Sequence, residues 1–406
     1  MIASRSARRS VAVVVTRLQA GAGGVALRGA LALDPSDYQV TILAGTASGT
    51  ADADGSGDTL ADRAVAAGLR LVQVPELVPN IAPGTEPRAL RILTEHLADG
   101  HYDVVHTHSA KAGALGRLAA IRAGVPRIVH TLHGFPFHEF QSAPRRAGYV
   151  AVERYLGQHT DVFLAIGGGV AAEAVRRGIA PPDRIRVIDP AIERTERPEG
   201  PAARAAARRR LGAPVGCRLV GTVGRVDYQK APECFVDAVA ALDRDDVHAV
   251  WIGDGPLRGK MEARARRRGL ADRFVCLGHR DDVAELLPGL DVFAMASRYE
   301  GLPCAIAEAM SAGVPVVATA VNAVPDLVVA GETGLLVGPQ RPRELATAIA
   351  HLLDHPAAAA RMTERAGRLL AGRFAPEVLG AVLDEVYADA PRRLTPDRSP
   401  ATVRSA

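Results

Sequence analysis

Aromatic side chains are scarce in this chain, at 4% of its 406 residues. Two arginine-rich runs, Arg204–Arg210 and Arg264–Arg268, have helical composition and contain no aromatic residue between the charges. Proteins that bind nucleic acid combine basic residues with stacking aromatics or carry recognisable motifs. The sequence therefore predicts no nucleic-acid partner, and we expect both runs to be solvated helix faces.

Cysteine is rarer still, and the four residues are widely separated, with no C-x-x-C pair: Cys217, Cys234, Cys276 and Cys304. This spacing argues against a zinc site and indicates reduced thiols in a cytoplasmic protein. Long hydrophobic runs are also missing. The run Val11–Val15, which follows three arginines, is too short for a signal-peptide core or a membrane span. The net charge of +4 leaves peripheral contact with the inner membrane face open.

Lysine is the scarcest charged residue. Only three of the 49 basic residues are lysines, Lys111, Lys230 and Lys260, so a lysine at a functional spacing rarely stands there by chance. Hydrophobic residues, by contrast, make up 48% of the chain, which is enough for large buried cores. A length of 406 residues is sufficient for two domains of ordinary size.

Strand and helix patterns alternate along the whole chain, which predicts an α/β fold with parallel sheets and helices on both faces. In the first half we expect strands at Val11–Thr16, Gln39–Leu43, Arg70–Val74, Asp103–Thr107, Arg127–Thr131, Val162–Ile166 and Arg184–Ile188. In the second half we expect strands at Leu219–Val223, His248–Ile252, Arg273–Leu277, Asp291–Ala296 and Val316–Ala318, with a last turn and strand over Gly331–Val337.

The alternation breaks between the two halves, where the chain becomes rich in proline, glutamate and arginine. We therefore predict an N-terminal domain over 1–190, a linker over 191–214 and a C-terminal domain over 215–374. A final helix is expected over 375–389, and the tail 390–406 is predicted to be disordered.

One βαβ unit stands out, from the strand Asp291–Ala296 through the helix Ala305–Ala312 to the next strand. Pro303 suits the start of that helix, because a proline there loses no hydrogen bond. Glu300 precedes the helix and Glu308 lies inside it, on either side of a helix N-terminus that favours a phosphate. Because open α/β sheets bind ligands at the carboxyl ends of their strands, the two glutamates are candidate binding residues. A Glu-x7-Glu pair alone also fits two solvated charges.

A second candidate site follows the strand Leu219–Val223. Arg225 and Lys230 lie in the loop that leaves this strand, and Lys230 is one of the three lysines. A guanidinium gives forked contacts to a phosphate and an ammonium gives a point charge, so the pair suits a pyrophosphate. The alternative is a surface loop with ordinary charges.

Glycine-rich turns also follow strand ends, at Gly23 and Gly24 in the first half and at Gly253-Asp254-Gly255 in the second. Glycine lets a backbone approach a ligand closely. Neither the first turn nor Gly221-Thr-Val-Gly224 has the G-x-G-x-x-G spacing of a dinucleotide fold. An NAD-dependent dehydrogenase is therefore disfavoured.

Five histidines cluster in the first half: His106, His108, His130, His133 and His138. A metal site would need a completing cysteine or carboxylate pair, which this region lacks, so no metal is predicted. His133 follows the strand Arg127–Thr131 at its carboxyl end, where a neutral imidazole can hydrogen-bond a sugar hydroxyl or a peptide carbonyl. The other four are expected to be structural.

These motifs together resemble those of the GT4-type retaining glycosyltransferases. The similar residues are Gly224-Arg225-x4-Lys230, Gly253-Asp254-Gly255 and Glu300-x7-Glu308, the last within Glu-Gly-Leu-Pro-x4-Glu-Ala-Met-x-Ala-Gly-Val-Pro-Val-Val-Ala. His106-Thr-His-Ser-Ala-Lys-Ala-Gly and His130-Thr-Leu-His-Gly resemble members that build bacterial exopolysaccharides or glycosylated natural products. The resemblance covers Val11 to about Tyr387 and implies the GT-B fold, in which two Rossmann-like, doubly wound domains face each other across a cleft.

The resemblance implies four catalytic residues: His133, Arg225, Lys230 and Glu300. Arg225 and Lys230 would hold the donor pyrophosphate and stabilise the departing nucleotide. Glu300 would contact hydroxyls of the donor sugar, and His133 would lie beside the sugar as it transfers. Positioned cations suit a step in which negative charge grows on a leaving phosphate. No carboxylate stands out as a covalent nucleophile, so a same-face mechanism is the working hypothesis, and no metal or cofactor is required.

The same resemblance implies a site for a nucleotide-diphosphate sugar, the donor substrate. Glu308 would bind the nucleotide ribose, and Gly23 and Gly24 would let the N-terminal domain approach the phosphates. The final helix would cross back onto that domain. The other donor-binding residues would be Gly224, Arg225, Lys230, Gly253, Asp254, Gly255, Glu300, Gly301, Leu302 and Pro303.

Some positions depart from the family's pattern. Ala231 stands where the family often has glycine after the motif lysine, and Gly167 stands in place of a usual serine. Asn322-Ala323-Val-Pro-Asp326 replaces Gly-Gly-x-Pro-Glu, and Asp189-Pro-Ala-Ile-Glu193 replaces Asn-Gly-Ile-Asp. None of these removes the charged donor set, but they leave the hinge geometry and the donor-sugar contacts open.

The expected activity is transfer of a hexose-type sugar from the nucleotide-diphosphate sugar to a hydroxyl of a glycan, lipid-linked or natural-product acceptor. Two alternatives share the fold: a sugar-nucleotide 2-epimerase, which would turn over donor without an acceptor, and a catalytically silent sugar-nucleotide-binding subunit. Acceptor contacts would come from the loops Gly45–Thr59 and Phe135–Arg146. The sequence identifies neither the nucleotide base, the sugar and the acceptor nor the oligomeric state.

Overall fold

The computed structural model describes residues 8–18, 21–45, 60–78, 84–137, 141–192, 200–280, 282–301 and 303–391. The chain divides into two compact units, each built around its own sheet. The first unit comprises Met1–Leu164, Ala174–Arg186 and Gly380–Ala406, and the second comprises Ala165–Glu173 and Val187–Leu379. The predicted α/β architecture with two Rossmann-like, doubly wound sheets is confirmed, whereas the domain boundaries proposed from the sequence stay predictions.

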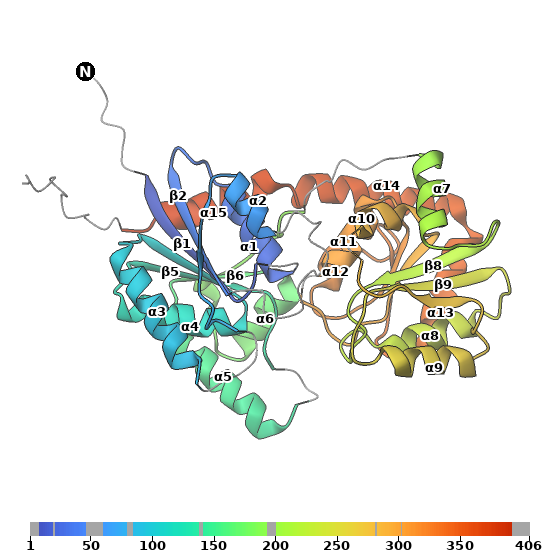
Figure 1. The fold of residues 1–406 in the computed structure, drawn as a ribbon, viewed down its shortest axis with the longest axis horizontal. Coiled ribbons are helices and arrows are strands. Elements are labelled where there is room, and N and C mark those ends of the chain that lie inside the picture. Colours follow the sequence, from blue (N-terminus) through green and yellow to red (C-terminus); the bar gives the residue numbers. More distant parts are fainter. Residues whose placement is uncertain are drawn as a thin grey trace, which may run out of the picture. The chain divides into compact units, whose positions relative to one another are not determined.

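The first sheet has seven strands in the order β3-β2-β1-β4-β5-β6-β7 (Figure 1). The pairs β1–β2, β2–β3, β1–β4 and β4–β5 are parallel. A parallel sheet covered on both faces needs apolar residues at successive positions, and Val11 to Val15 of β1 are all at most 2% exposed. The strands are β1 (Arg9–Val15), β2 (Tyr38–Ala44), β3 (Arg70–Gln73), β4 (Val104–His108), β5 (Arg127–Leu132), β6 (Val162–Ala165) and β7 (Ile185–Val187).

Helices cover both faces of this sheet, with α1, α2 and α15 on one face and α3 and α4 on the other (Figure 1). The last helix is tied to the strands by side-chain contacts: the Tyr38 hydroxyl donates to Asp384 at 2.6 Å, and the Tyr387 hydroxyl lies 2.5 Å from His106 Nδ1. The helices are α1 (Ala22–Leu31), α2 (Leu60–Ala66), α3 (Glu86–Asp99), α4 (Ala110–Arg122), α5 (Ala143–Gln158), α6 (Gly168–Arg176) and α15 (Pro376–Ala388), with a 3-10 turn η1 (Pro182–Arg184). The first residues of α6, up to Glu173, and of α15, up to Leu379, count with the second unit.

The start of α1 corrects one expectation from the sequence. Gly23 and Gly24 were expected in a turn before a helix at Ala26, but α1 begins at Ala22 and includes both glycines. A Cβ on Gly23 would lie 2.5 Å from the Arg17 carbonyl oxygen. Close packing of the helix start against the preceding loop therefore overrides the low helix propensity of glycine.

The second sheet has six strands in the order β10-β9-β8-β11-β12-β13, paired in parallel. The strands are β8 (Arg218–Val223), β9 (Val247–Ile252), β10 (Phe274–Cys276), β11 (Val292–Met295), β12 (Val316–Thr319) and β13 (Leu335–Val337). Apolar residues fill both sides of the sheet, including Trp251 on β9 and Phe293 on β11, each at most 1% exposed.

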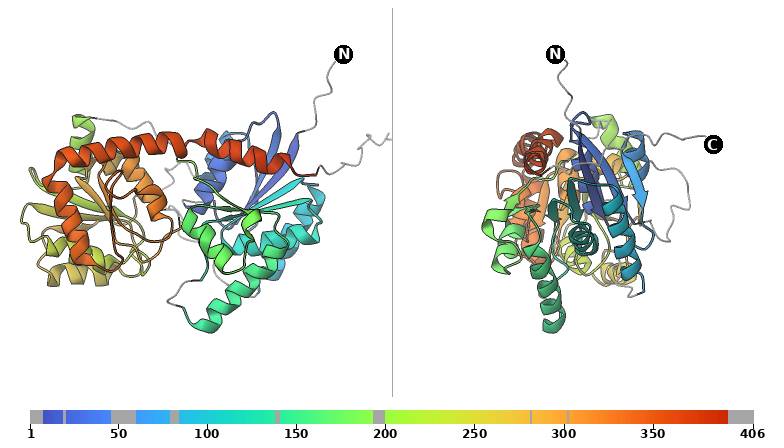
Figure 2. Two further views of the ribbon diagram at one scale, coloured as in Figure 1. Left: turned by 180° about the vertical axis from the view of Figure 1, so that it is seen from behind. Right: turned by 90° about the vertical axis from the view of Figure 1, so that its left-hand side faces the viewer.

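Two groups of helices cover the second sheet (Figure 2). One group packs against the core that contains Trp251 and consists of α8 (Pro232–Ala241), α9 (Arg258–Arg267) and α13 (Pro342–Asp354). The other packs against the core that contains Phe293 and consists of α7 (Pro201–Arg210), α10 (Val283–Leu286), η2 (Leu287–Gly289), α11 (Cys304–Ser311), α12 (Val324–Leu327) and α14 (Pro356–Arg373). Ala359 and Met362, in the first half of α14, pack against the Trp251 core as well. Within the described ranges, no helix combines the length and the hydropathy that a membrane span requires. All four cysteines are free thiols.

The arginine-rich runs are more than solvated faces, which corrects a second expectation. Arg204 and Arg208 on α7 both pair with Asp291, at 2.7 and 3.1 Å, and Leu219 N–H donates to the same carboxylate at 2.7 Å. In the other run, Arg264 and Arg268 both donate to Asp237, on the neighbouring helix α8. Forked guanidinium groups therefore attach these helices to their neighbours, a pairing that helical composition does not reveal.

The first unit contains a buried ion pair whose loss should be measurable. Arg117 on α4 is fully buried and donates to Glu153 on α5 at 2.7 Å. We expect Glu153→Ala to destabilise this unit by about 3 kcal/mol, because an unpaired charge is left in the interior. That corresponds to a fall of about 6 to 12 °C in the thermal midpoint of this unit, which circular dichroism can measure.

Glu95→Ala is the matched control for this variant, because Glu95 pairs with Arg91 at 3.2 Å on the exposed surface of α3. Exposed pairs of this kind contribute about 0.5 kcal/mol or less, so the midpoint should barely move. Equal shifts in the two variants would contradict the importance of the buried pair.

Candidate active site

The order of the second sheet creates a switch point between β8 and β11. The chain leaves β8 toward β9 on one side and leaves β11 toward β12 on the other. The loops after these two strands, residues 224–231 and 296–303, therefore diverge at the carboxyl edge of the sheet. Ligands of open α/β sheets bind in the crevice that such diverging loops form.

The two loops are bonded to each other through Arg298. Its N–H donates to the Gln229 carbonyl at 2.8 Å, and its guanidinium donates to the Tyr228 carbonyl at 2.6 Å. The same guanidinium lies over the Tyr228 ring, 4.1 Å from the centroid, and pairs with Glu233. The spacing between the loops is therefore fixed by the protein itself.

Lys230 and Glu300 meet where the two loops face each other. Lys230 Nζ donates to Glu300 Oε1 at 2.6 Å, and the Glu300 side chain is only 4% exposed. Ser297 Oγ donates to the same oxygen at 2.5 Å, whereas Oε2 accepts one long bond of 3.3 Å from Gln229. A carboxylate offers about four acceptor positions, so Oε2 retains capacity for hydroxyl groups of a ligand.

Arg225 is placed differently from Lys230. Its side chain is 76% exposed and its Nε lies 3.5 Å from Asp227 Oδ2, while Asp227 Oδ1 accepts the Lys230 N–H at 3.2 Å. Arg225 thus carries a weakly held guanidinium at the mouth of the loop, available to an anion. Both residues of the cation pair that the sequence suggested therefore contact Asp227, Arg225 through its side chain and Lys230 through its backbone N–H.

The predicted glycine turns are explained first by packing of the chain on itself. A Cβ on Gly224 would lie 3.1 Å from Lys230 Cε, and a Cβ on Gly253 would lie 2.2 Å from the Gly224 carbonyl oxygen. A Cβ on Gly255 would lie 2.6 Å from the Val226 carbonyl oxygen. Asp254 accepts Gly255 N–H at 2.7 Å and pairs with Arg258 at 2.9 Å, and these contacts lower the pKa of its carboxyl group. Direct contact of these residues with a donor stays a prediction.

The helix that follows Glu300 begins at Cys304, one residue after Pro303. Pro303 is buried, and Glu308 lies in the fifth position of this helix with a partly exposed side chain. Gly301 belongs to the preceding bend, and Leu302 lies outside the described residues. Glu300 and Glu308 therefore flank the helix N-terminus as the sequence suggested.

Several departures from the family pattern fall at positions with a positive φ. Ala231 and Asn322 have φ of +49° and +44°, in the left-handed region where glycine is favoured. Gly167 has φ of +134°, and a Cβ there would lie 2.6 Å from both Ala323 Cβ and Asp326 Oδ2. A serine at 167 would therefore be excluded by conformation and by space.

His133, Gly23 and Gly24 belong to the first unit. His133 Nε2 lies 3.0 Å from His108 Nδ1, so one of these rings donates to the other. Burial, together with the charge of Arg28, lowers the pKa of His133 to about 3. At neutral pH the ring is therefore uncharged, as expected for a group that hydrogen-bonds a neutral partner.

His106 and His130 make internal contacts in the buried part of the sheet. His106 Nε2 lies 2.7 Å from the Thr131 hydroxyl, and His130 Nδ1 lies 2.8 Å from the Thr107 hydroxyl. These contacts fit the structural roles expected for both residues, while His138 lies outside the described residues. In the described part of the chain, no group of three histidine, cysteine or acidic side chains is arranged to hold a metal ion.

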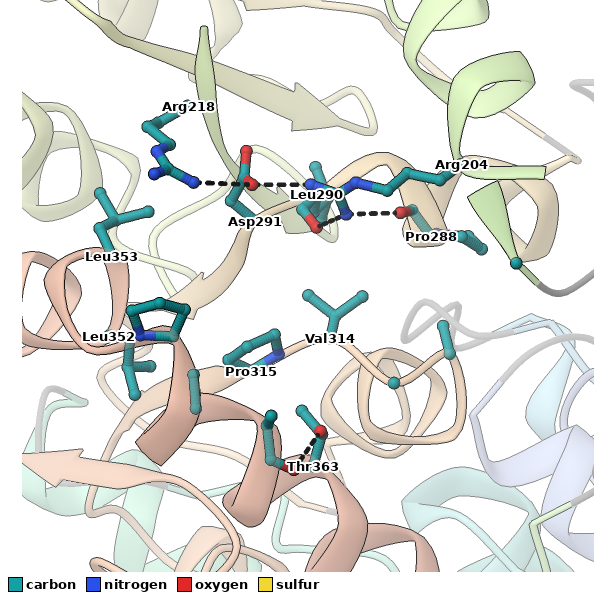
Figure 3. A pocket seen from close by; sticks show the side chains of 16 residues that line it. Arg204, Arg218, Pro288, Leu290, Asp291, Val314, Pro315, Leu352, Leu353 and Thr363 are labelled. Atoms are coloured by element: carbon teal, nitrogen blue, oxygen red, sulfur yellow. Dashed lines mark hydrogen bonds and ion pairs between the residues drawn. The ribbon is translucent and has the colours of Figure 1, made fainter. Parts of the chain in front are cut away.

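A pocket of about 400 Å³ opens at the opposite edge of the second sheet, near the amino ends of β8, β11 and β12. Figure 3 shows Arg204 and Arg218 on either side of Asp291, above apolar side chains that include Val314 and Leu353. Arg204 donates to the carbonyls of Pro288 and Leu290 as well as to Asp291. These hydrogen bonds attach α7 to the segment that precedes β11. We therefore regard this pocket as a space between packed elements, distinct from the site formed by the loops after β8 and β11.

Comparison with known proteins identifies the family of the chain. Residues 20–191 match the family model described as "Glycosyl transferase 4-like domain", and residues 217–355 match "Glycosyl transferases group 1". The D-inositol 3-phosphate glycosyltransferase of Xylanimonas cellulosilytica is 33% identical over 313 residues, 73% of this chain and 74% of that protein. The Escherichia coli UDP-Gal:alpha-D-GlcNAc-diphosphoundecaprenol alpha-1,3-galactosyltransferase is 31% identical over 268 residues, 63% of this chain and 67% of that protein.

Solved structures show the same fold. Anabaena HepE in complex with UDP and glucose has a TM-score of 0.80 at 19% identity, covering 94% of this chain and all of that chain. WaaG, a glycosyltransferase involved in lipopolysaccharide biosynthesis, has a TM-score of 0.72 at 19% identity, covering 93% and 99%. The fold and the matches to the family models define a GT-B glycosyltransferase. The chain belongs to the GT4-type family of glycosyl transferases, as its motifs suggested.

The buried histidines should make the first unit sensitive to acid. Burial lowers the pKa of His106 to about 3, below its unfolded value near 6.5. The unfolded chain therefore binds a proton that the folded chain does not bind. The contribution of His106 to stability is fully present above about pH 6.5 and is lost as the pH falls toward 3. For such a group the free energy of unfolding changes by about 1.4 kcal/mol per pH unit.

We expect His106→Gln to flatten the fall of the thermal midpoint between pH 7.5 and pH 5, because glutamine does not titrate in that range. The variant keeps polar atoms for Tyr387 and Thr131, so it should still fold at pH 7.5. Identical slopes in wild type and variant would show that His106 contributes nothing to the acid response.

Proposed function

We propose that this protein is a retaining glycosyltransferase that moves a hexose-type sugar from a UDP-sugar to a hydroxyl of a phosphorylated or lipid-linked acceptor. The observation that carries the proposal is the contact of Lys230 with Glu300 at the switch point, 2.6 Å long, with the exposed Arg225 beside it. The name of the Escherichia coli relative contains UDP-Gal, and HepE has been crystallised with UDP and with UDP-glucose. UDP is therefore the first nucleotide to test.

The charges of the site suit a diphosphate next to a sugar. Arg225 would turn from Asp227 toward the pyrophosphate, and Lys230 would keep Glu300 while donating its other N–H groups to a phosphate oxygen. Glu300 Oε2, which has one weak bond, would accept a hydroxyl of the donor sugar. Glu308 would accept the ribose hydroxyls from its place in α11.

The proposed bond changes are those of a same-face transfer. The bond between the anomeric carbon and the diphosphate oxygen breaks, and the acceptor hydroxyl attacks the same face while its proton passes to the leaving phosphate oxygen. Arg225 and Lys230 stabilise the negative charge that grows there, an effect worth several kcal/mol for a well-placed donor. In this proposal the Glu300 carboxylate acts as a hydrogen-bond acceptor for the sugar, with its Oε1 held by Lys230 and Ser297.

The first unit would supply His133 and the acceptor site. With its low pKa, the imidazole of His133 would donate a neutral hydrogen bond to a sugar hydroxyl. One relative is named for a diphosphoundecaprenol acceptor and another for inositol 3-phosphate, so we propose an acceptor that carries a phosphate. With a lipid-linked acceptor the protein would work in the cytoplasm, at the inner membrane face, and it would need no metal or cofactor.

Nucleotide binding is the first prediction. UDP at a hundred times its dissociation constant should stabilise the protein by about 2.7 kcal/mol, detected as a rise in thermal midpoint. GDP, dTDP and ADP are tested in the same way for comparison. Glu308→Ala should abolish the rise in thermal midpoint, because the ribose loses its hydrogen-bond acceptor. If no nucleotide binds at millimolar concentration, the proposed donor site is wrong.

Turnover is the second prediction. Arg225→Gln should lower kcat by about a hundredfold, the cost of one transition-state donor, without changing the thermal midpoint, because the side chain is 76% exposed. Arg280→Gln, which removes an arginine from another loop of this unit, is the control for loss of charge. The product anomer, read by proton coupling in the same assay, should match the donor. An inverted product would refute retention, and consumption of donor without acceptor would favour the epimerase.

A further inference from the structure

The Glu300 loop is also held by a third loop, which follows β12. Asn322 Oδ1 accepts the backbone N–H of Glu300 at 2.9 Å. Two residues earlier, Arg298 N–H donates to the Gln229 carbonyl at 2.8 Å. The backbone from Arg298 to Glu300 is therefore bonded on both sides, to the β8 loop and to the β12 loop.

Asn322 is more than a residue that tolerates an unusual conformation. Its φ of +44° lies in the left-handed region, where asparagine is several-fold enriched and glycine is freely allowed. In the resembling family a Gly-Gly pair occupies this place. Glycine would satisfy the backbone but would offer no side-chain oxygen to the Glu300 amide, so asparagine adds a contact that the conformation does not require.

The segment that carries Asn322 is itself anchored within the second unit. Asp326 Oδ2 accepts the Gly168 N–H at 3.0 Å, and Ala323 is 1% exposed against Gly167. Val324 and Leu327 of α12 are fully buried in the core. Asn322 can therefore act as a fixed support for the Glu300 loop.

We propose that Asn322 is a positioning residue of the donor-sugar site: by holding the Glu300 amide, it fixes the direction in which Glu300 Oε2 meets the sugar. This inference rests on the proposed function, because it takes Glu300 as the acceptor of a sugar hydroxyl. Lys230 and Ser297 hold Oε1, and Asn322 holds the backbone end of the same residue. With both ends of Glu300 fixed, its carboxylate needs little reorganisation when the donor sugar binds.

The contact pattern predicts where the effect should fall. Asn322 bonds the Glu300 amide, whereas Arg225 and Lys230, the groups proposed to bind the pyrophosphate, contact Asp227 and the Glu300 carboxylate instead. Loss of the Asn322 oxygen should therefore weaken use of the sugar and leave binding of the free nucleotide intact. The expected size is a three- to tenfold loss, the range of one neutral hydrogen bond.

Two variants separate the side-chain oxygen from the backbone conformation. Asn322→Gly keeps the left-handed φ and removes the acceptor, whereas Asn322→Asp keeps an acceptor oxygen in the same place. With UDP-glucose or UDP-galactose as donor, we expect Asn322→Gly to lower kcat/KM about three- to tenfold while the thermal shift with UDP alone stays unchanged. Asn322→Asp should restore most of the loss. Unchanged kinetics in the glycine variant, or an aspartate variant no better than glycine, would overturn the proposal.

Hydrogen exchange provides a readout that needs no turnover. In peptides that contain Glu300, Asn322→Gly should exchange faster than wild type and Asn322→Asp should not, while peptides from α13 remain unchanged. If wild type uses no UDP-sugar, the proposed function fails, and the exchange result still decides whether Asn322 holds the loop. Faster exchange throughout the second unit, with a lower thermal midpoint, would show a general structural role and overturn the positioning role.

Discussion

The close approach of two strand ends governs the geometry of the second unit. The Gly224 carbonyl at the end of β8 accepts a hydrogen bond from Trp251 Nε1 at 2.8 Å and occupies the space that a Cβ on Gly253 would need. The β8 loop is thereby pressed against the end of β9 before it continues to Lys230. Because Gly224 also leaves room for the lysine side chain, this constraint places the ammonium group opposite Glu300.

The Lys230–Glu300 pair then sets the electrostatics of the site. A carboxylate that is 4% exposed is costly to bury unless it is paired and hydrogen-bonded, and Glu300 has Lys230, Ser297 and Gln229 for this purpose. The pair is neutral overall, and Arg225 is itself paired with Asp227 at 3.5 Å, so under the proposed function its exposed guanidinium would have to leave this carboxylate to meet a diphosphate. The two cations therefore differ, since one is nearly buried while the other is 76% exposed.

The sequence predicted the sheets well because buried parallel strands are continuous apolar runs, and it predicted the loops because charged residues follow those runs. It did not predict which side chains contact one another. Lys230 and Glu300 are 70 residues apart, and the roles of Ser297 and Asn322 depend on loop paths that no periodicity encodes. The arginines of α7 were misjudged for the same reason, since their partner Asp291 lies more than 80 residues away. The serine that directly follows an apolar strand was the one signal available for Ser297.

The departures from the family pattern indicate what the site needs from its backbone. Ala231 keeps a left-handed φ of +49° although a side chain there costs about 1 kcal/mol, and Asn322 does the same at +44°. The left-handed conformation is therefore kept at both positions although neither residue is glycine. The path of each loop thus matters more than the absence of a side chain. At Ala231 nothing described offsets that cost, whereas at Asn322 the side chain gains a bond to the backbone N–H of Glu300. A family motif of glycines can thus be replaced when the new side chain supports the same loop.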